Sequence, residues 1–144
     1  MPNDSGAGAV QPPLFSILRQ RTYLIASIHT ALDDSQLIRF QRDLIEQVGR
    51  DRARGIIIDV AALDVLDSFA TRTLRNLAEM ANLRGAITVI VGIQPEIAFA
   101  VVQLGMDLGS LRTALDLDEG LATLDAITDG GGRFRNLPYT GRAR

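Results

Sequence analysis

Two short runs of consecutive apolar residues, with one amphipathic helical segment between them, constrain the fold of this chain more than any other feature. The runs are residues 55–60 (GIIIDV) and 86–92 (AITVIVG). Their length and continuous hydrophobicity are typical of strands buried on both faces of a sheet. Between them, residues 68–83 carry apolar side chains at helical spacing, and Arg84-Gly85 ends that segment. A strand, a helix and a second strand in this order predict a right-handed parallel crossover.

The segments before this unit predict a hairpin and a capped helix. Residues 14–18 and 22–28 are strand-like runs with only three residues between them. That spacing allows an antiparallel hairpin and excludes a crossover helix. Asp33 and Asp34 then begin a helix, and Gln36 stands three residues after Asp33, where it completes a capping box.

The segments after the unit continue the alternation. Pro95 suits the first turn of a helix that Gly105 ends. Residues 111–117 are expected to form a last strand, and Asp118 is expected to cap a final helix. The predicted order is β-β-α-β-α-β-α-β-α, which indicates an α/β fold with a mixed sheet opened by an antiparallel hairpin.

The two ends of the chain differ from its middle. A chain of 144 residues suits one domain, which we place at residues 14–128. Residues 1–13 have neither a basic region nor an apolar signal segment, and they are expected to be a flexible leader. Because glycine loses the most backbone freedom on ordering, three glycines at 130–132 predict the end of the domain. Residues 129–144 are expected to be a disordered tail rich in Gly and Arg.

The composition excludes several kinds of protein. The chain has no Cys, so disulfides, thiolate zinc sites and cysteine nucleophiles are excluded, and a His-dependent triad could use only His29. The net charge of -2 gives no reason to expect nucleic acid as a partner. No apolar stretch is long enough to cross a bilayer, so a cytoplasmic protein without a membrane partner is expected. All fifteen basic residues are Arg, and Lys is absent.

We expect the functional site where helix 68–83 begins. In open α/β sheets, function concentrates at the carboxyl ends of strands and at the helix N-termini that follow. Ser68 places a hydroxyl among the unpaired backbone N–H groups of the first turn, with Asp67 directly before it. The alternative is that Asp67 or Ser68 only caps the helix, which stabilises it by about 1 kcal/mol.

One flank of this helix is expected to be a docking surface. Phe69 projects about a quarter-turn from the stripe that faces the sheet. A large apolar side chain beside a hydroxyl suits a protein contact. Alternatively, Phe69 packs on a neighbouring helix or loop. The same flank carries Arg72, Thr73, Asn76 and Met80.

The helix predicted after Pro95 is apolar nearly all round. Phe99 lies opposite the stripe of Ile97, Val101 and Leu104. Such a helix is either buried on two sides or part of a protein–protein contact. A domain of 15.6 kDa has little room to bury a helix twice, so we expect self-association or packing against a related subunit.

Three enzyme hypotheses fit the sequence poorly. A serine hydrolase would need glycines beside Ser68 and a base, for which only His29 is available. A phosphate-binding P-loop needs a Gly-rich run followed by Lys. A phospho-accepting receiver domain would use carboxylates such as Asp33, Asp34 and Asp59, but such domains also rely on a Lys. We therefore expect no catalytic residue, no metal site and no cofactor, and Asp59 should fix the loop after its strand.

Residues 55–74 (GIIIDVAALDVLDSFATRTL) resemble the STAS domain family, which includes anti-sigma-factor antagonists and the C-terminal domains of sulfate transporters. Gly85, residues 91–95 (VGIQP) and Leu104-Gly105 continue the resemblance. It implies that a partner serine kinase phosphorylates Ser68. Within the family, Asp67-Ser68-Phe69 followed by Ala-Thr-Arg is most similar to stressosome scaffold subunits, whereas direct anti-sigma antagonists more often have Asp-Ser-Ser-Gly.

The resemblance also implies a set of partners. The unphosphorylated protein would hold an RsbT-like switch serine kinase in a shell built with RsbR-like STAS subunits, and a phosphatase acting on Ser68 would reset the site. The residues expected to contact partners are Asp67, Phe69, Arg72 and Asn76. Two alternatives remain: a direct anti-sigma-factor antagonist, and a structural or ligand-binding STAS module in which Ser68 is no switch.

Overall fold

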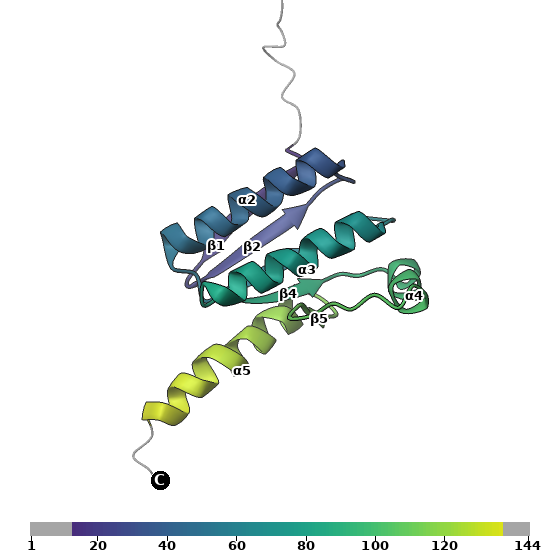
Figure 1. Ribbon diagram of the computed structural model, residues 1–144. Helices are drawn as coiled ribbons and strands as arrows, with labels where there is room; N and C mark the ends of the chain where they lie inside the picture. The colour runs from purple at the N-terminus through teal and green to yellow at the C-terminus, as the bar shows by residue number, and fades with distance from the viewer. Residues whose placement is uncertain (1–12, 137–144) are drawn as a thin grey trace, which may run out of the picture.

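The computed structural model describes residues 13–136 and, within them, five strands and four helices in the predicted order (Figure 1). The strands are β1 (Phe15–Gln20), β2 (Tyr23–Ile28), β3 (Gly55–Asp59), β4 (Ile87–Val91) and β5 (Arg112–Ala114). The helices are α2 (Asp34–Asp51), α3 (Ser68–Leu83), α4 (Pro95–Gln103) and α5 (Leu117–Asn136). The predicted α/β fold is confirmed.

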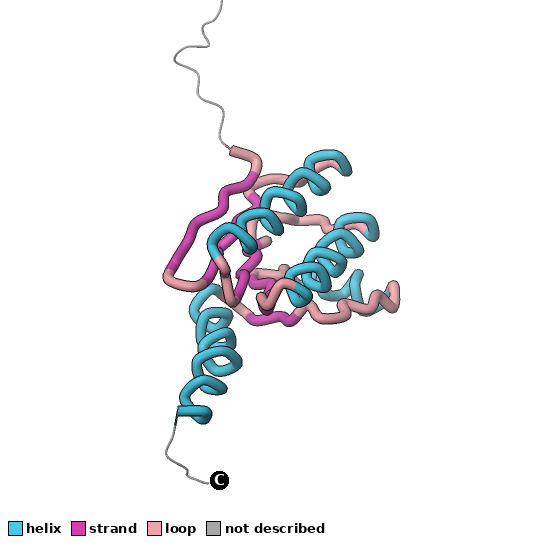
Figure 2. Tube along the Cα trace, turned by 60° about the vertical axis from the view of Figure 1, so that its left-hand side comes forward, coloured by secondary structure: helices cyan, strands magenta, loops and turns pink. Residues whose placement is uncertain are grey.

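The strands form one mixed sheet in the order β1-β2-β3-β4-β5. β1 and β2 pair antiparallel through the predicted hairpin, and all other neighbours pair parallel, as crossover helices require. In β3, Ile56 and Ile58 point to one face and Ile57 to the other. α2 and α3 lie side by side over the first face, and α5 covers the second (Figures 1 and 2).

The predicted start of α2 and both predicted ends of α3 are confirmed. The Asp33 carboxylate accepts a hydrogen bond from the Gln36 N–H at 2.8 Å, and the Gln36 side chain accepts one from the Asp33 N–H at 2.8 Å. The bonds from the Gln36 backbone and the Ser35 hydroxyl hold the pKa of the Asp33 carboxyl below its ordinary value. α3 begins at Ser68 and ends before Gly85, whose φ of 88° is left-handed and favours glycine.

The start of α5 differs from the prediction that Asp118 caps it. Asp116 is the cap, because its carboxylate accepts a hydrogen bond from the Glu119 N–H at 2.9 Å. β5 ends at Ala114, earlier than the strand predicted to run to residue 117, so the chain turns into the helix sooner. Asp118 therefore lies in the first turn, where a carboxylate interacts favourably with the positive end of the helix dipole.

α5 also extends further than expected. It continues through the three glycines at 130–132 to Asn136, whereas the sequence predicted a disordered tail from residue 129. A helical glycine costs about 1 kcal/mol relative to alanine, but it allows helical dihedrals, so the hydrogen-bond ladder can pass through it. The predicted leader up to residue 12 and the tail from residue 137 lie outside the described residues.

Candidate functional site

The loop between β3 and α3 is fixed at its beginning by hydrogen bonds. The Asp59 carboxylate accepts one from the Ala61 N–H at 2.9 Å, which confirms its predicted role in the loop. The Val60 N–H donates to the Val91 carbonyl of β4 at 3.0 Å, and the Leu63 side chain is buried. These contacts hold the loop that delivers residues 67 and 68 to the start of α3.

Asp67 and Ser68 have different roles at this helix start. Asp67 is the N-cap: its carboxylate accepts a hydrogen bond from the Ala70 N–H at 2.8 Å, and its carbonyl accepts one from the Thr71 hydroxyl at 2.9 Å. Ser68 is the first helical residue and is exposed. Within residues 13–136 the Ser68 hydroxyl makes no hydrogen bond. The capping alternative therefore holds for Asp67, whereas the exposed Ser68 side chain does not cap the helix.

The flank predicted to be a docking surface is only partly open. Arg72 and Asn76 are exposed, but Phe69 is half-buried. Thr73, expected on the open flank, is 4% exposed and donates its hydroxyl to the Phe69 carbonyl at 2.8 Å. Gln41 of α2 donates to the Thr73 carbonyl at 3.2 Å, which shows that this flank faces α2. Part of the Phe69 surface is therefore covered by the domain itself, as the packing alternative predicted.

A groove of about 390 Å³ runs beside Ser68, between α3 and the segment that follows α4. Sequence reasoning missed Arg75 as a member of this site, although it stands seven residues after Ser68 and so lies near it on the same helical face. Asn76 and Phe69 do not line the groove. The lining residues are Ser68, Thr71, Arg72, Arg75, Leu104, Met106 and Asp107.

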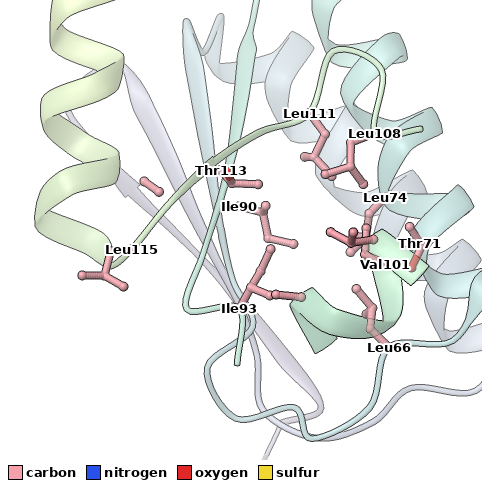
Figure 3. A pocket seen from close by; sticks show the side chains of 13 residues that line it. Leu66, Thr71, Leu74, Ile90, Ile93, Val101, Leu108, Leu111, Thr113 and Leu115 are labelled. Atoms are coloured by element: carbon pink, nitrogen blue, oxygen red, sulfur yellow. The ribbon is translucent and has the colours of Figure 1, made fainter. Parts of the chain in front are cut away.

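A second, apolar cavity of about 320 Å³ lies between α3, β4, α4 and β5 (Figure 3). Ile90 of β4, Leu74 of α3 and Val101 of α4 all line it. Thr71 lines both this cavity and the groove beside Ser68. The walls of the apolar cavity carry no charged side chain, so any ligand held there would be neutral and largely apolar.

α4 packs on the domain through the buried side chain of Ile97 and the partly buried side chain of Val101. Leu104, which shares the predicted stripe with Ile97 and Val101, is 65% exposed. Leu104 is the C-cap of α4, and Gly105, whose φ of 64° is left-handed, follows it where the predicted stop lies. Phe99 and Val102 are 68% and 78% exposed, and with Leu104 they form what we call the α4 apolar face.

The described residues hold neither a membrane span nor a metal cluster. No helix of the described residues is long and apolar enough to span a bilayer. Within the same part of the chain, no three His, Asp or Glu side chains gather closely enough to hold a metal ion.

Comparison with known sequences gives a family match over most of the chain. Residues 16–120 match the STAS domain. The RsbT co-antagonist protein RsbRA of Bacillus subtilis (strain 168) is 31% identical over 98 residues, which are 68% of this chain and 36% of RsbRA. The chain thus spans about a third of the length of that relative.

Solved structures show the same likeness in three dimensions. A serine-to-glutamate variant of RsbS from Moorella thermoacetica superposes with a TM-score of 0.70 at 33% identity, over 79% of this chain and 97% of that one. A chain from a structure of the stressosome, described as a signal integration and transduction hub, gives a TM-score of 0.63 at 31% identity, over 78% and 97% of the two chains.

Proposed function

Because the chain belongs to the STAS domain family, we propose that it is a non-enzymatic stressosome scaffold, which sequesters a switch serine kinase until Ser68 is phosphorylated. It is a stressosome-type protein related to RsbS and RsbR. The observation that carries the proposal is the exposed Ser68 hydroxyl, which has no hydrogen-bond partner among the described residues. It stands at the first residue of α3, in a chain that superposes on 97% of RsbS.

The chemistry at Ser68 is a single phosphoryl transfer. The Ser68 oxygen forms a bond to the γ-phosphorus of the kinase's ATP, ADP leaves, and the hydroxyl proton passes to the kinase's base. The product adds a charge of about -1.5 to -2 and three acceptor oxygens at the start of a helix. The helix N-terminus favours an anion, so α3 keeps its structure.

The phosphate is favourable for α3 but unfavourable for a partner bound at this surface. The new charge lies next to Asp67, whose carboxylate is exposed. A kinase docked over Asp67, Phe69, Arg72 and Asn76 would meet like-charge repulsion and would have to desolvate the phosphate. Changing the kinase from almost fully bound to almost fully free takes about 5.5 kcal/mol of differential affinity. A doubly charged group inside the contact is a suitable source of that difference.

Assembly with RsbR-like STAS subunits is the second part of the proposal. The α4 apolar face supports it, because Phe99 and Val102 are large, exposed and carried on one short helix. Likeness to a stressosome chain and to an RsbT co-antagonist favours another STAS subunit as the occupant of that face. A phosphatase acting on Ser68 completes the cycle.

A ligand-binding STAS module is the second candidate function, and one observation favours it. The apolar cavity of about 320 Å³ is twice the roughly 150 Å³ of an engineered protein cavity that binds benzene. Native mass spectrometry, alone and with an RsbR-like subunit, separates the candidates. A scaffold forms large assemblies, whereas a ligand-binding module stays small.

The decisive experiment is phosphorylation of the full chain by an RsbT-like kinase with mass mapping of the site. We expect phosphate on Ser68. Ser68→Ala should keep the fold and leave the kinase bound in the presence of ATP, and Ser68→Asp should weaken kinase binding. Ser35→Ala is the matched control, since Ser35 is also an exposed serine in the first turn of a helix. Phosphate found only on Thr71 or Thr73, which are 3% and 4% exposed, would refute the site assignment.

A further inference from the structure

Two arginines of α3 share the groove with Ser68. Arg72 and Arg75 follow it by four and seven residues, so all three lie on one face of the helix. Helical side chains lean toward the N-terminus, which directs both guanidinium groups back toward Ser68. An acidic group placed four residues before a basic one is also the favourable order on a helix.

Neither arginine is neutralised within the described residues, where Arg72 and Arg75 make no ion pair. The acidic groups around them are instead engaged with backbone N–H groups. Asp107, which lines the groove, accepts from Gly109 at 2.9 Å, and Glu79 accepts from Ser110 at 3.1 Å. Asp67 accepts from Ala70. The groove therefore holds two unpaired cations beside a hydroxyl, which suits a group with several anionic oxygens.

We propose that the phosphate on Ser68 is bound by Arg72 and Arg75 of the same chain. The inference rests on the proposed phosphorylation of Ser68 and adds a mechanism of release to it. Before modification, exposed Arg72 is available to an acidic partner. After modification, the phosphate occupies its guanidinium group, so the partner loses a cation and gains an anion at the same place. Phosphorylation then replaces a positive charge on this surface by a negative one, and the backbone does not move.

The test places phosphoserine at position 68 of the full chain during translation, so that no kinase is needed. The second pKa of the phosphate is then followed by ³¹P NMR titration. It should lie about 1 unit below the value of about 6 found for free phosphoserine, because nearby cations favour the dianion. Arg72→Gln with Arg75→Gln should raise it by about the same amount, and each single change should raise it partly.

Two matched variants sharpen the result. Arg50→Gln removes one charge from an exposed arginine in the last turn of α2, and it should leave the phosphate pKa unchanged. Asp107→Asn should lower that pKa further, because it removes an acid from the groove and keeps the oxygen that accepts from Gly109. Circular dichroism confirms that each variant is folded.

An unchanged phosphate pKa in both single arginine variants and in the double variant would overturn the inference. That failure is distinct from failure of the proposed function. If an RsbT-like kinase never modifies Ser68 of the unmodified chain, the proposed switch is wrong, yet the titration still measures whether Arg72 and Arg75 bind the phosphate.

Discussion

At the scale of single residues, the cap of α3 and the proposed phosphorylation site are two neighbouring residues. Asp67 caps the helix through its bond to the Ala70 N–H, and the adjacent Ser68 has no bond to lose within residues 13–136. Asp67→Ala should therefore lower the free energy of unfolding by about 1 kcal/mol. Ser68→Ala should change it by less than about 0.5 kcal/mol. Urea denaturation of both variants checks this, and an equal loss in the two would contradict the division.

Gly120 is a second residue whose identity the packing demands. A Cβ there would lie 2.8 Å from Cγ1 of Val91 and 3.3 Å from Cδ1 of Ile57, both in buried strands. Gly120→Ala gains about 1 kcal/mol of helix propensity, but overpacking a core costs about 1–3 kcal/mol. We expect a net loss of stability in urea denaturation. Ala122→Gly, at an exposed position of the same helix, measures the propensity effect alone, and a stabilised Gly120→Ala variant would refute the close approach.

At the scale of elements, α4 is the helix that leaves large apolar side chains, Phe99 and Val102, mostly exposed. Phe99→Ser and Val102→Ser should leave the monomer folded, because both side chains are mostly exposed. They should reduce assembly with an RsbR-like subunit by about tenfold or more, since burying a large apolar side chain is worth about 1.5–3 kcal/mol. Native mass spectrometry measures the assembled fraction.

The control for this element is Leu83→Ser. Leu83 is 87% exposed at the far end of α3, so the change removes a comparable apolar side chain from another surface. Its assembled fraction should equal that of the parent chain. If Leu83→Ser impairs assembly as much as the α4 changes do, the α4 apolar face is not the contact.

At the scale of the whole molecule, we expect the switch to act on the surface and not on the fold. The core on both faces of the sheet is formed away from Ser68, and the helix N-terminus accepts an anion. Amide NMR spectra of the chain with phosphoserine at 68 should change only around the start of α3 and the segment after α4. Shifts spread through β2 and α5 would instead indicate a refolded domain.

The sequence alone determined most of the fold and the part of the site at Asp67 and Ser68, because these features are local. The alternation of apolar runs and amphipathic segments, the capping box at Asp33 and the bounds of α3 depend on residues within a few positions of one another. The same holds for the junction at Asp67 and Ser68. Periodicity and capping act over one or two turns, so a single sequence displays them.

Contacts between segments that are far apart in the chain were determined only by the tertiary structure. The burial of Thr73 on the flank facing α2 and the exposure of Leu104 follow from how neighbouring elements pack. The groove that joins Ser68 and Arg75 to Asp107 is of the same kind, since its two walls come from separate segments. No local pattern encodes these contacts, because they arise when the sheet brings its helices and loops together.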